Sequence, residues 1–317
     1  MRRNFIIGIL IVLAIFFIMK MGHSKKQAGS GAEVEVEAKA EAKVSSPLPE
    51  SEIALNMALE IKTNNPEQAV EALDKVIADF PQTIEAEKAI ITIADIYNKG
   101  QDTDMEKQAL NRLIEQYPNS ELKEKALDRV ATINLDSFFS RAPTANSIIY
   151  EVQPGDSLYK IAKQYHTNVE LIQKTNNLNS SLIKPGMKLK VITSVFSLFV
   201  SKTDCLMTLK ADGELVKVYK IGIGRDNSTP VGQFKIVNRI ISPVWYKTGA
   251  IVPAGSAENI LGTRWLGLSE PGYGIHGTVD NQPIQQQKTQ GCVRMMNDQV
   301  EELFVIVPVG TEIVIVD

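Results

Sequence analysis

Residues 274–278 (GIHGT) and 289–295 (TQGCVRM) contain the two side chains around which the chain is organised. They supply one histidine, His276, and one cysteine, Cys292, each beside a glycine. A cysteine attacks carbonyl carbons as a thiolate, and an unperturbed thiol is mostly protonated at neutral pH. A neighbouring imidazole can accept that proton and later return it to a leaving amine. On residue types alone, a buried cysteine and an unrelated loop histidine are the commoner explanation.

The sequence strings around these two residues are more specific evidence than the residue types alone. HGT followed by a polar loop and TxGCVRM resembles the active-site signature of the L,D-transpeptidase (YkuD-type) family. The likeness runs from about Val195 to Asp317 and includes residues 229–234 (TPVGQF) and 261–265 (LGTRW). The resemblance implies a mostly β catalytic domain over residues 195–317. It also implies that Cys292 is the nucleophile and His276 its general base.

Further roles follow from this resemblance. The carbonyl of Gly277 is expected to orient the imidazole through its other nitrogen. The N–H groups of Gly291 and Cys292 are candidate donors to an oxyanion. Arg294 is suited to substrate carboxylates, and a salt bridge that holds the active-site loop is the alternative. The residues predicted to bind substrate are Arg294, Gln290, Thr278 and Trp265.

One position departs from the family pattern. The family usually has histidine immediately before Gly-Cys, and this chain has Gln290. Glutamine donates and accepts hydrogen bonds but does not titrate. His276 remains available as the base, whereas the chain would be inactive if the replaced histidine were the essential base.

Local patterns in the catalytic region indicate strands. Alternation over 273–276 places His276 opposite Ile275, so that His276 faces a cleft if Ile275 faces the core. Asp212-Gly213 predicts the turn of a β-hairpin between residues 206–210 and 215–219. Residues 297–304 suggest one short helix, and residues 304–316 are strand-like with a turn at 308–310.

Residues 148–193 form a second compact unit. Helices are expected at 158–165 and 169–175, with Asp156 capping the first, and a strand at 187–192. The resulting strand-helix-helix-strand pattern resembles a LysM domain. The resemblance implies binding of the N-acetylglucosamine-containing backbone of peptidoglycan or chitin. The residues implied to bind glycan are Gly155, Asp156, Ser157, Leu182 and Ile183.

Residues 52–135 are helical and repeat. Residues 72–77 (ALDKVI) return as residues 109–114 (ALNRLI), a shift of 37 positions (109 − 72) that lies near the ~34 residues of a tetratricopeptide repeat. The region resembles a short tetratricopeptide-like hairpin stack. Such a stack either holds a peptide of an envelope protein or is a plain spacer.

The N-terminus resembles an export segment. Arg2 and Arg3 precede an apolar run over residues 5–19, and no small-x-small cleavage site follows it. We therefore expect residues 1–23 to be an uncleaved membrane anchor in preference to a signal peptide. Because the arginines precede the run, the remainder lies outside the cytoplasm, on the periplasmic side of a bacterial envelope. Residues 24–51 and 136–147 are predicted linkers.

Composition excludes other classes. The formal net charge of −3 argues against nucleic-acid binding, and 317 residues support two or three modest domains. Two cysteines, Cys205 and Cys292, provide neither a disulfide scaffold nor a metal cluster, and no metal or cofactor is expected. A bridge between them would block the nucleophile, so we expect Cys205 to pack as a small apolar residue.

The predicted architecture is multidomain: an N-terminal membrane helix, α-helical hairpin repeats, a small α+β LysM domain and a mostly β catalytic domain. The first functional hypothesis is a peptidoglycan L,D-transpeptidase that forms 3-3 crosslinks through a cysteine thioester. The second is an L,D-carboxypeptidase, or an enzyme attaching proteins to peptidoglycan, that uses the same cysteine. The third is a non-catalytic peptidoglycan-binding scaffold.

Overall fold

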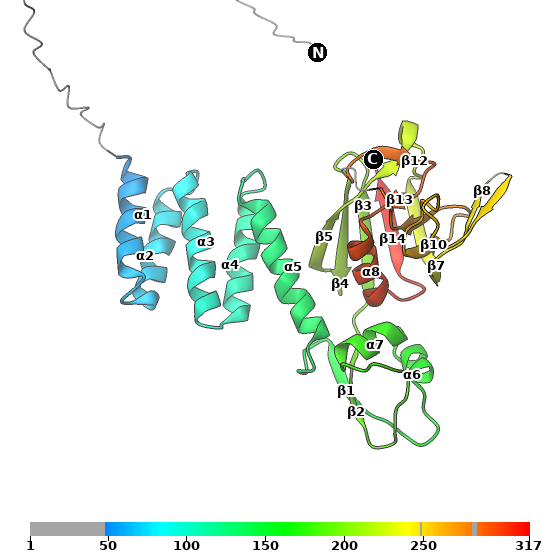
Figure 1. Ribbon diagram of the computed structural model, residues 1–317. Helices are drawn as coiled ribbons and strands as arrows, with labels where there is room; N and C mark the ends of the chain where they lie inside the picture. The colour runs from blue at the N-terminus through cyan, green and yellow to red at the C-terminus, as the bar shows by residue number, and fades with distance from the viewer. Residues whose placement is uncertain (1–47, 248, 281–283) are drawn as a thin grey trace, which may run out of the picture. The chain divides into compact units, whose positions relative to one another are not determined.

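The computed structural model describes residues 48–247, 249–280 and 284–317 (Figure 1). The predicted membrane anchor and all but the last four residues of the first predicted linker lie outside the described residues. Within those ranges, no helix has both the length and the apolar character needed to cross a membrane.

Five helices make up the first described region. They are α1 (Glu50–Ile61), α2 (Pro66–Asp79), α3 (Ile84–Lys99), α4 (Thr103–Gln116) and α5 (Lys123–Phe139). Asn65, Thr83 and Asp102 cap α2, α3 and α4, because each side-chain oxygen accepts a backbone N–H of the first turn. A core that includes Leu73, Ile90 and Leu110 joins the helices, as the predicted hairpin repeats require.

Helix α5 continues past the predicted boundary at residue 135. The predicted linker over 136–147 is therefore wrong for its first residues, which are helical through Phe139. Leu135 and Phe138 pack into the core of the predicted catalytic domain (residues 195–317), and this burial keeps the end of the helix ordered.

Helix α5 also covers the edge strand of the catalytic sheet, β5 (Glu214–Lys220). The side-chain amide of Asn134 donates to the carbonyl oxygens of Leu215 at 2.9 Å and Val216 at 3.2 Å. Lys220 pairs with Glu124 at the same contact. Such a cover protects carbonyl groups that an open sheet edge would leave unpaired.

Asn134→Ala is expected to lower the free energy of unfolding by about 1–2 kcal/mol, because two partly buried carbonyls lose their donor. Thermal unfolding measures the change. Thr132→Ala is the matched control, since the Thr132 hydroxyl donates only to Asp128 within the exposed face of the same helix. An Asn134→Ala protein as stable as the control would contradict the prediction.

The LysM-like unit has the predicted strand-helix-helix-strand order. Strand β1 (Ser147–Glu151) pairs antiparallel with β2 (Lys188–Ile192), and α6 (Leu158–Gln164) and α7 (Val169–Thr175) lie between them in the chain. The predicted cap is wrong by one residue. Ser157 caps α6 by accepting the N–H of Lys160, because Ser157 has the extended conformation next to the first helical residue. Asp156 instead accepts the N–H of Gln153 at 2.7 Å and the hydroxyl of Tyr150 at 2.8 Å.

The catalytic region is built on one eight-stranded sheet with the order β13-β11-β10-β7-β14-β3-β4-β5. Its remaining strands are β3 (Phe196–Ser201), β4 (Leu206–Ala211), β7 (Gly232–Ile241), β10 (Arg264–Leu268), β11 (Gly274–His276), β13 (Val293–Arg294) and β14 (Glu312–Val316). Two small pairs flank it: β6 (Ile223–Gly224) with β12 (Gln287–Thr289), and β8 (Trp245–Lys247) with β9 (Ala250–Val252). The predicted hairpin is β4–β5, and positive φ angles at Asp212 and Gly213 form its two-residue turn.

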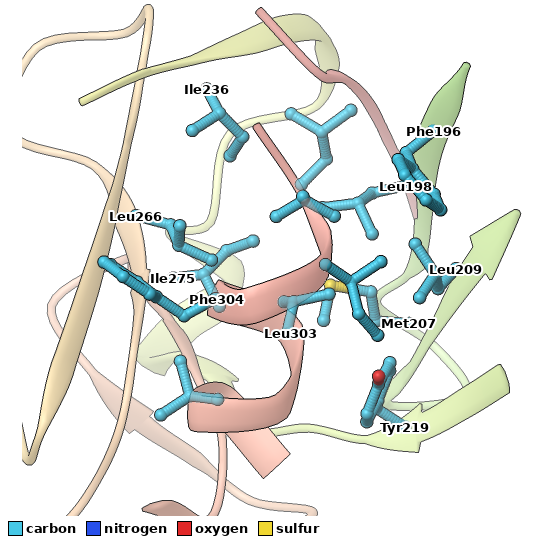
Figure 2. Close-up of a cluster of buried hydrophobic side chains, with 14 of the residues drawn as sticks. Phe196, Leu198, Met207, Leu209, Tyr219, Ile236, Leu266, Ile275, Leu303 and Phe304 are labelled. Atoms are coloured by element: carbon cyan, nitrogen blue, oxygen red, sulfur yellow. The ribbon is translucent and has the colours of Figure 1, made fainter. Parts of the chain in front are cut away.

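Helix α8 (Asn297–Ile306) packs against this sheet. Figure 2 shows Leu303 and Phe304 of α8 among side chains of the sheet, such as Leu266 and Ile275. Residues 304–306 were expected to be strand-like and are helical. Buried residues at 300, 303, 304 and 307 follow the helical spacing, and Pro308 then forces Val307 into an extended conformation.

Candidate active site

The register of two neighbouring strands places His276 and Cys292 on one face of the sheet. Strand β11 pairs in parallel with β13, with Ile275 opposite Val293 and His276 opposite Arg294. Ile275 and Val293 are buried in the core. Because successive side chains alternate between faces, His276 and Cys292 point to the other side. Both line one cavity of about 600 Å³.

The wall of this cavity is largely apolar. It comes from the end of β7, the β8–β9 hairpin and the segments before β10 and β11. Its described lining comprises Ile240, Pro243, Val244, Trp245, Tyr246, Ile260, Leu261, Trp265, Gly272, Tyr273, His276, Thr289, Gln290 and Cys292. The predicted residues Trp265 and Gln290 therefore share a cavity with His276 and Cys292.

The imidazole of His276 is held at one nitrogen by its own loop. Nδ1 lies 2.6 Å from the carbonyl oxygen of Gly277, and the side chain is 2 % exposed. A carbonyl oxygen only accepts, so Nδ1 carries the hydrogen and Nε2 keeps its lone pair. The second nitrogen is thus in the form that a general base requires.

Trp265 holds the ring of His276 from the side. The two rings stack at a centroid distance of 6.1 Å and an interplanar angle of 15°. The indole Nε1 donates to Oδ1 of Asn238 at 3.1 Å. A Cβ atom at Gly274 would lie 2.5 Å from the indole, so the absence of a side chain at this position leaves space for the Trp265 ring. Trp265 thus contacts the His276 ring in addition to lining the cavity.

Burial keeps both reactive groups neutral. It lowers the pKa of His276 from 6.5 to about 4, against the hydrogen bond to Gly277, and the positive charge of Arg294 lowers it further. Burial also raises the pKa of the Cys292 thiol, against a hydrogen bond with the backbone of Gly274. The thiol donates to the carbonyl oxygen of Gly272 at 3.7 Å. The resting pair is a neutral thiol and a neutral imidazole.

Thr289 organises the loop that carries the cysteine. Its hydroxyl donates to the carbonyl oxygen of Cys292 at 2.7 Å and accepts the N–H of Gly291 at 3.2 Å. The Gly291 N–H, one of two predicted oxyanion donors, is therefore engaged within the loop, and the N–H of Cys292 remains as the candidate. Gly291 has φ 128°, and a Cβ atom there would lie 2.5 Å from Tyr273.

Thr229, from the 229–234 string, supports the loop that carries Cys292 through its contact with Gly224. Thr229 Oγ1 accepts the N–H of Gly224 at 2.8 Å. A Cβ atom at Gly224 would lie 2.6 Å from Cα of Gly291, so the two backbones touch here. Neither Thr229 nor Thr289 was singled out from the sequence, although both lie in the strings that carry the family resemblance.

Two predicted substrate-binding residues lie outside the described lining of the cavity. Arg294 is 5 % exposed and forms an ion pair with Asp280 at 3.2 Å. Its backbone N–H and C=O exchange 2.8 Å hydrogen bonds with Gly222. The structure thus contains the loop-holding salt bridge that the sequence left as the alternative. Thr278 is buried, and its hydroxyl accepts the N–H of Asp280 at 3.0 Å.

The remaining candidates lie elsewhere. Gly155, Asp156 and Ser157 form the β1–α6 loop, and Leu182 and Ile183 lie between α7 and β2, with Leu182 74 % exposed. Both cysteines are free thiols, and Cys205 packs partly buried against the catalytic core. Among the described residues, no group of three His, Cys, Asp or Glu side chains is arranged to hold a metal ion.

Known families match the chain in the order that the sequence indicated. Residues 196–315 match the L,D-transpeptidase catalytic domain, residues 150–191 the LysM domain, and residues 54–83 and 89–120 the tetratricopeptide repeat. The chain is 34 % identical over 175 residues to “Putative L,D-transpeptidase YkuD” of Bacillus licheniformis, covering 52 % of this chain and 97 % of that protein. It is 31 % identical over 176 residues to the protein of the same name in Bacillus subtilis, covering 53 % and 98 %.

A solved L,D-transpeptidase from Mycobacterium tuberculosis aligns with a TM-score of 0.35 and 15 % identity, over 42 % of this chain and 64 % of that one. The structure thus places a cysteine and a histidine in one cavity at the edge of the sheet. On the sequence matches, the chain belongs to the L,D-transpeptidase family, which confirms the resemblance. Its LysM and tetratricopeptide regions precede the catalytic domain.

Proposed function

We propose that this protein is a peptidoglycan L,D-transpeptidase that works through a thioester on Cys292. The observation that carries the proposal is the hydrogen bond between Nδ1 of His276 and the carbonyl of Gly277, in the cavity that also holds Cys292. It leaves Nε2 as a base on the face of the sheet where the thiol lies. Family membership supports the same chemistry.

In the first half-reaction the Cys292 side chain turns from Gly272 and gives its proton to Nε2 of His276. The sulfur attacks the carbonyl carbon of the third residue in a tetrapeptide stem, forming a C–S bond. The N–H of Cys292 donates to the resulting oxyanion. Collapse breaks the C–N bond to D-alanine, whose nitrogen takes the proton from the imidazolium, and the thioester remains.

In the second half-reaction an amine of another stem attacks the thioester carbon. It loses a proton to Nε2 of His276, the C–S bond breaks, and the thiolate recovers that proton. The product is a 3-3 crosslink and the enzyme returns to its resting state. Water as acceptor would give a tripeptide, and the same intermediate serves both outcomes.

The LysM domain supports a location at the wall, outside the cytoplasm. A weak glycan contact would raise the local concentration of stems without new contacts in the cavity. We place the glycan between the 155–157 loop and residues 182–183. Residues 1–23 would add a membrane attachment.

The full-length protein is to be incubated with disaccharide-tetrapeptide stems, and the products analysed by mass spectrometry. Crosslinked dimers with loss of D-alanine are the expected result. Tripeptide alone would assign a carboxypeptidase. A folded protein that yields neither product, and that forms no thioester adduct with a carbapenem, would be a wall-binding scaffold and would contradict the proposal.

A further inference from the structure

Asn297, the first residue of α8, connects two loops that frame the histidine. Its side-chain oxygen Oδ1 accepts the backbone N–H of Thr278 at 3.1 Å and that of Thr263 at 3.2 Å. Thr278 follows β11 and Thr263 immediately precedes β10. One amide oxygen therefore joins the beginning of α8 to both strands that bear His276 and Trp265.

The backbone at Gly277 and Gly262 packs tightly around this oxygen. A Cβ atom at Gly277 or at Gly262 would collide with Oδ1 of Asn297. Gly262 also has φ 65°, in the left-handed region that side chains rarely adopt. Two glycines thus bring the loops close enough for a single oxygen to reach both N–H groups.

The N–H of Thr278 belongs to the peptide group that serves His276. The C=O of Gly277 and the N–H of Thr278 are the two ends of one planar peptide, and in a trans peptide they point in opposite directions. Fixing the N–H toward Asn297 therefore fixes the direction of the carbonyl that accepts from Nδ1. The two hydrogen bonds also polarise one another through the peptide.

We infer that Asn297 is a positioning residue that holds His276 in its Nδ1–H form. The chain of contacts runs from Asn297 Oδ1 through the 277–278 peptide to the imidazole. In a serine protease a carboxylate orients the histidine by direct contact. Here a neutral amide does so indirectly, through the 277–278 peptide group. The catalytic meaning of this inference rests on the proposed function, in which Nε2 is the base.

A neutral oxygen at this position agrees with the low pKa of His276. A carboxylate would accept from the same two N–H groups but would stabilise the imidazolium. Asn297→Asp therefore keeps the geometry while changing the charge, and Asn297→Ala removes the acceptor. Asp298→Ala is the matched control, because Asp298 is an exposed residue of the same first turn.

The test uses the full-length protein with ¹⁵N-labelled histidine. Ring nitrogen shifts report the tautomer of His276, assigned by comparison with His276→Gln, and intact-mass kinetics give the rate of carbapenem acylation. Wild type and Asp298→Ala are expected to show one Nδ1–H tautomer. Asn297→Ala is expected to show mixed tautomers and roughly tenfold to hundredfold slower acylation.

Asn297→Asp is expected to retain the tautomer and to move the acidic limb of the rate profile to higher pH. A wild-type tautomer with a rate within twofold in Asn297→Ala would overturn the inference. If Asn297→Ala does not fold, an unshifted acidic limb in Asn297→Asp overturns it instead. A wild-type protein that is never acylated and that makes no product from stems would refute the proposed function, while the tautomer comparison would still decide the role of Asn297.

Discussion

Replacing Cys292 with serine should slow carbapenem acylation and stem turnover by about 10⁴-fold or more, the scale seen when a nucleophile is removed. The imidazole of His276, with a pKa of about 4, is a weak base. It assists a thiol that is already acidic compared with an alcohol, and it cannot deprotonate a serine hydroxyl to a useful extent. Intact-mass kinetics against wild type measure the loss.

Cys205→Ser is the matched control for this change. Cys205 is also a free thiol with a pKa raised by burial, and its Sγ lies 3.5 Å from the carbonyl oxygen of Lys202, within a turn. The control should be acylated at the wild-type rate. An adduct that persists in Cys292→Ser and disappears in Cys205→Ser would show that Cys205 is the nucleophile and would contradict the prediction.

Local signals in the sequence were sufficient where one turn, or the alternation of side chains along one strand, decides the conformation. Asp212-Gly213 predicted the β4–β5 hairpin because both residues tolerate positive φ. The order of strands and helices in the LysM-like unit followed from the expected short helices at 158–165 and 169–175 and the expected strand at 187–192. Alternation about Ile275 likewise indicated which way His276 points, because the side-chain period of a strand is two.

Contacts between distant segments could not be read in the same way. The Asn297 oxygen meets the N–H of Thr263, 34 positions earlier, only because Gly262 and Gly277 let three segments converge. The sequence left Arg294 with two candidate roles, and only the folded loop shows that Asp280 lies close enough to form an ion pair with it. The end of α5 depended on a partner surface, since Phe138 is buried by the catalytic domain rather than by its own helices.

The pH dependence of the acylation rate distinguishes a neutral Cys292–His276 pair from a thiolate–imidazolium pair. His276 accepts a proton only when its imidazole is neutral, so the acylation rate should be flat from about pH 5 to neutrality. Below about pH 4 it should fall tenfold for each pH unit. A pKa left near 6.5 would instead place this limb more than two pH units higher.

Alkylation of Cys292 by iodoacetamide gives an independent readout, because that reaction follows the thiolate. Because burial raises the pKa of the Cys292 thiol, Cys292 should react slowly at neutral pH and progressively faster as the solution becomes alkaline. A plateau of rapid alkylation between pH 5 and 8 would reveal a preformed ion pair and would contradict the neutral pair.

The lowered pKa of His276 also makes the free energy of unfolding depend on pH. Between pH 6.5 and about 4 the unfolded chain binds a proton at His276 that the folded chain does not, so the free energy of unfolding decreases as the pH falls. The difference between 6.5 and about 4 corresponds to about 3 kcal/mol, fully expressed below pH 4. His276→Gln should lose this component, so its stability relative to wild type should rise as the pH is lowered. Denaturation at pH 7 and pH 4 measures both differences, and equal pH dependence in the two proteins would show that His276 titrates normally in the folded state.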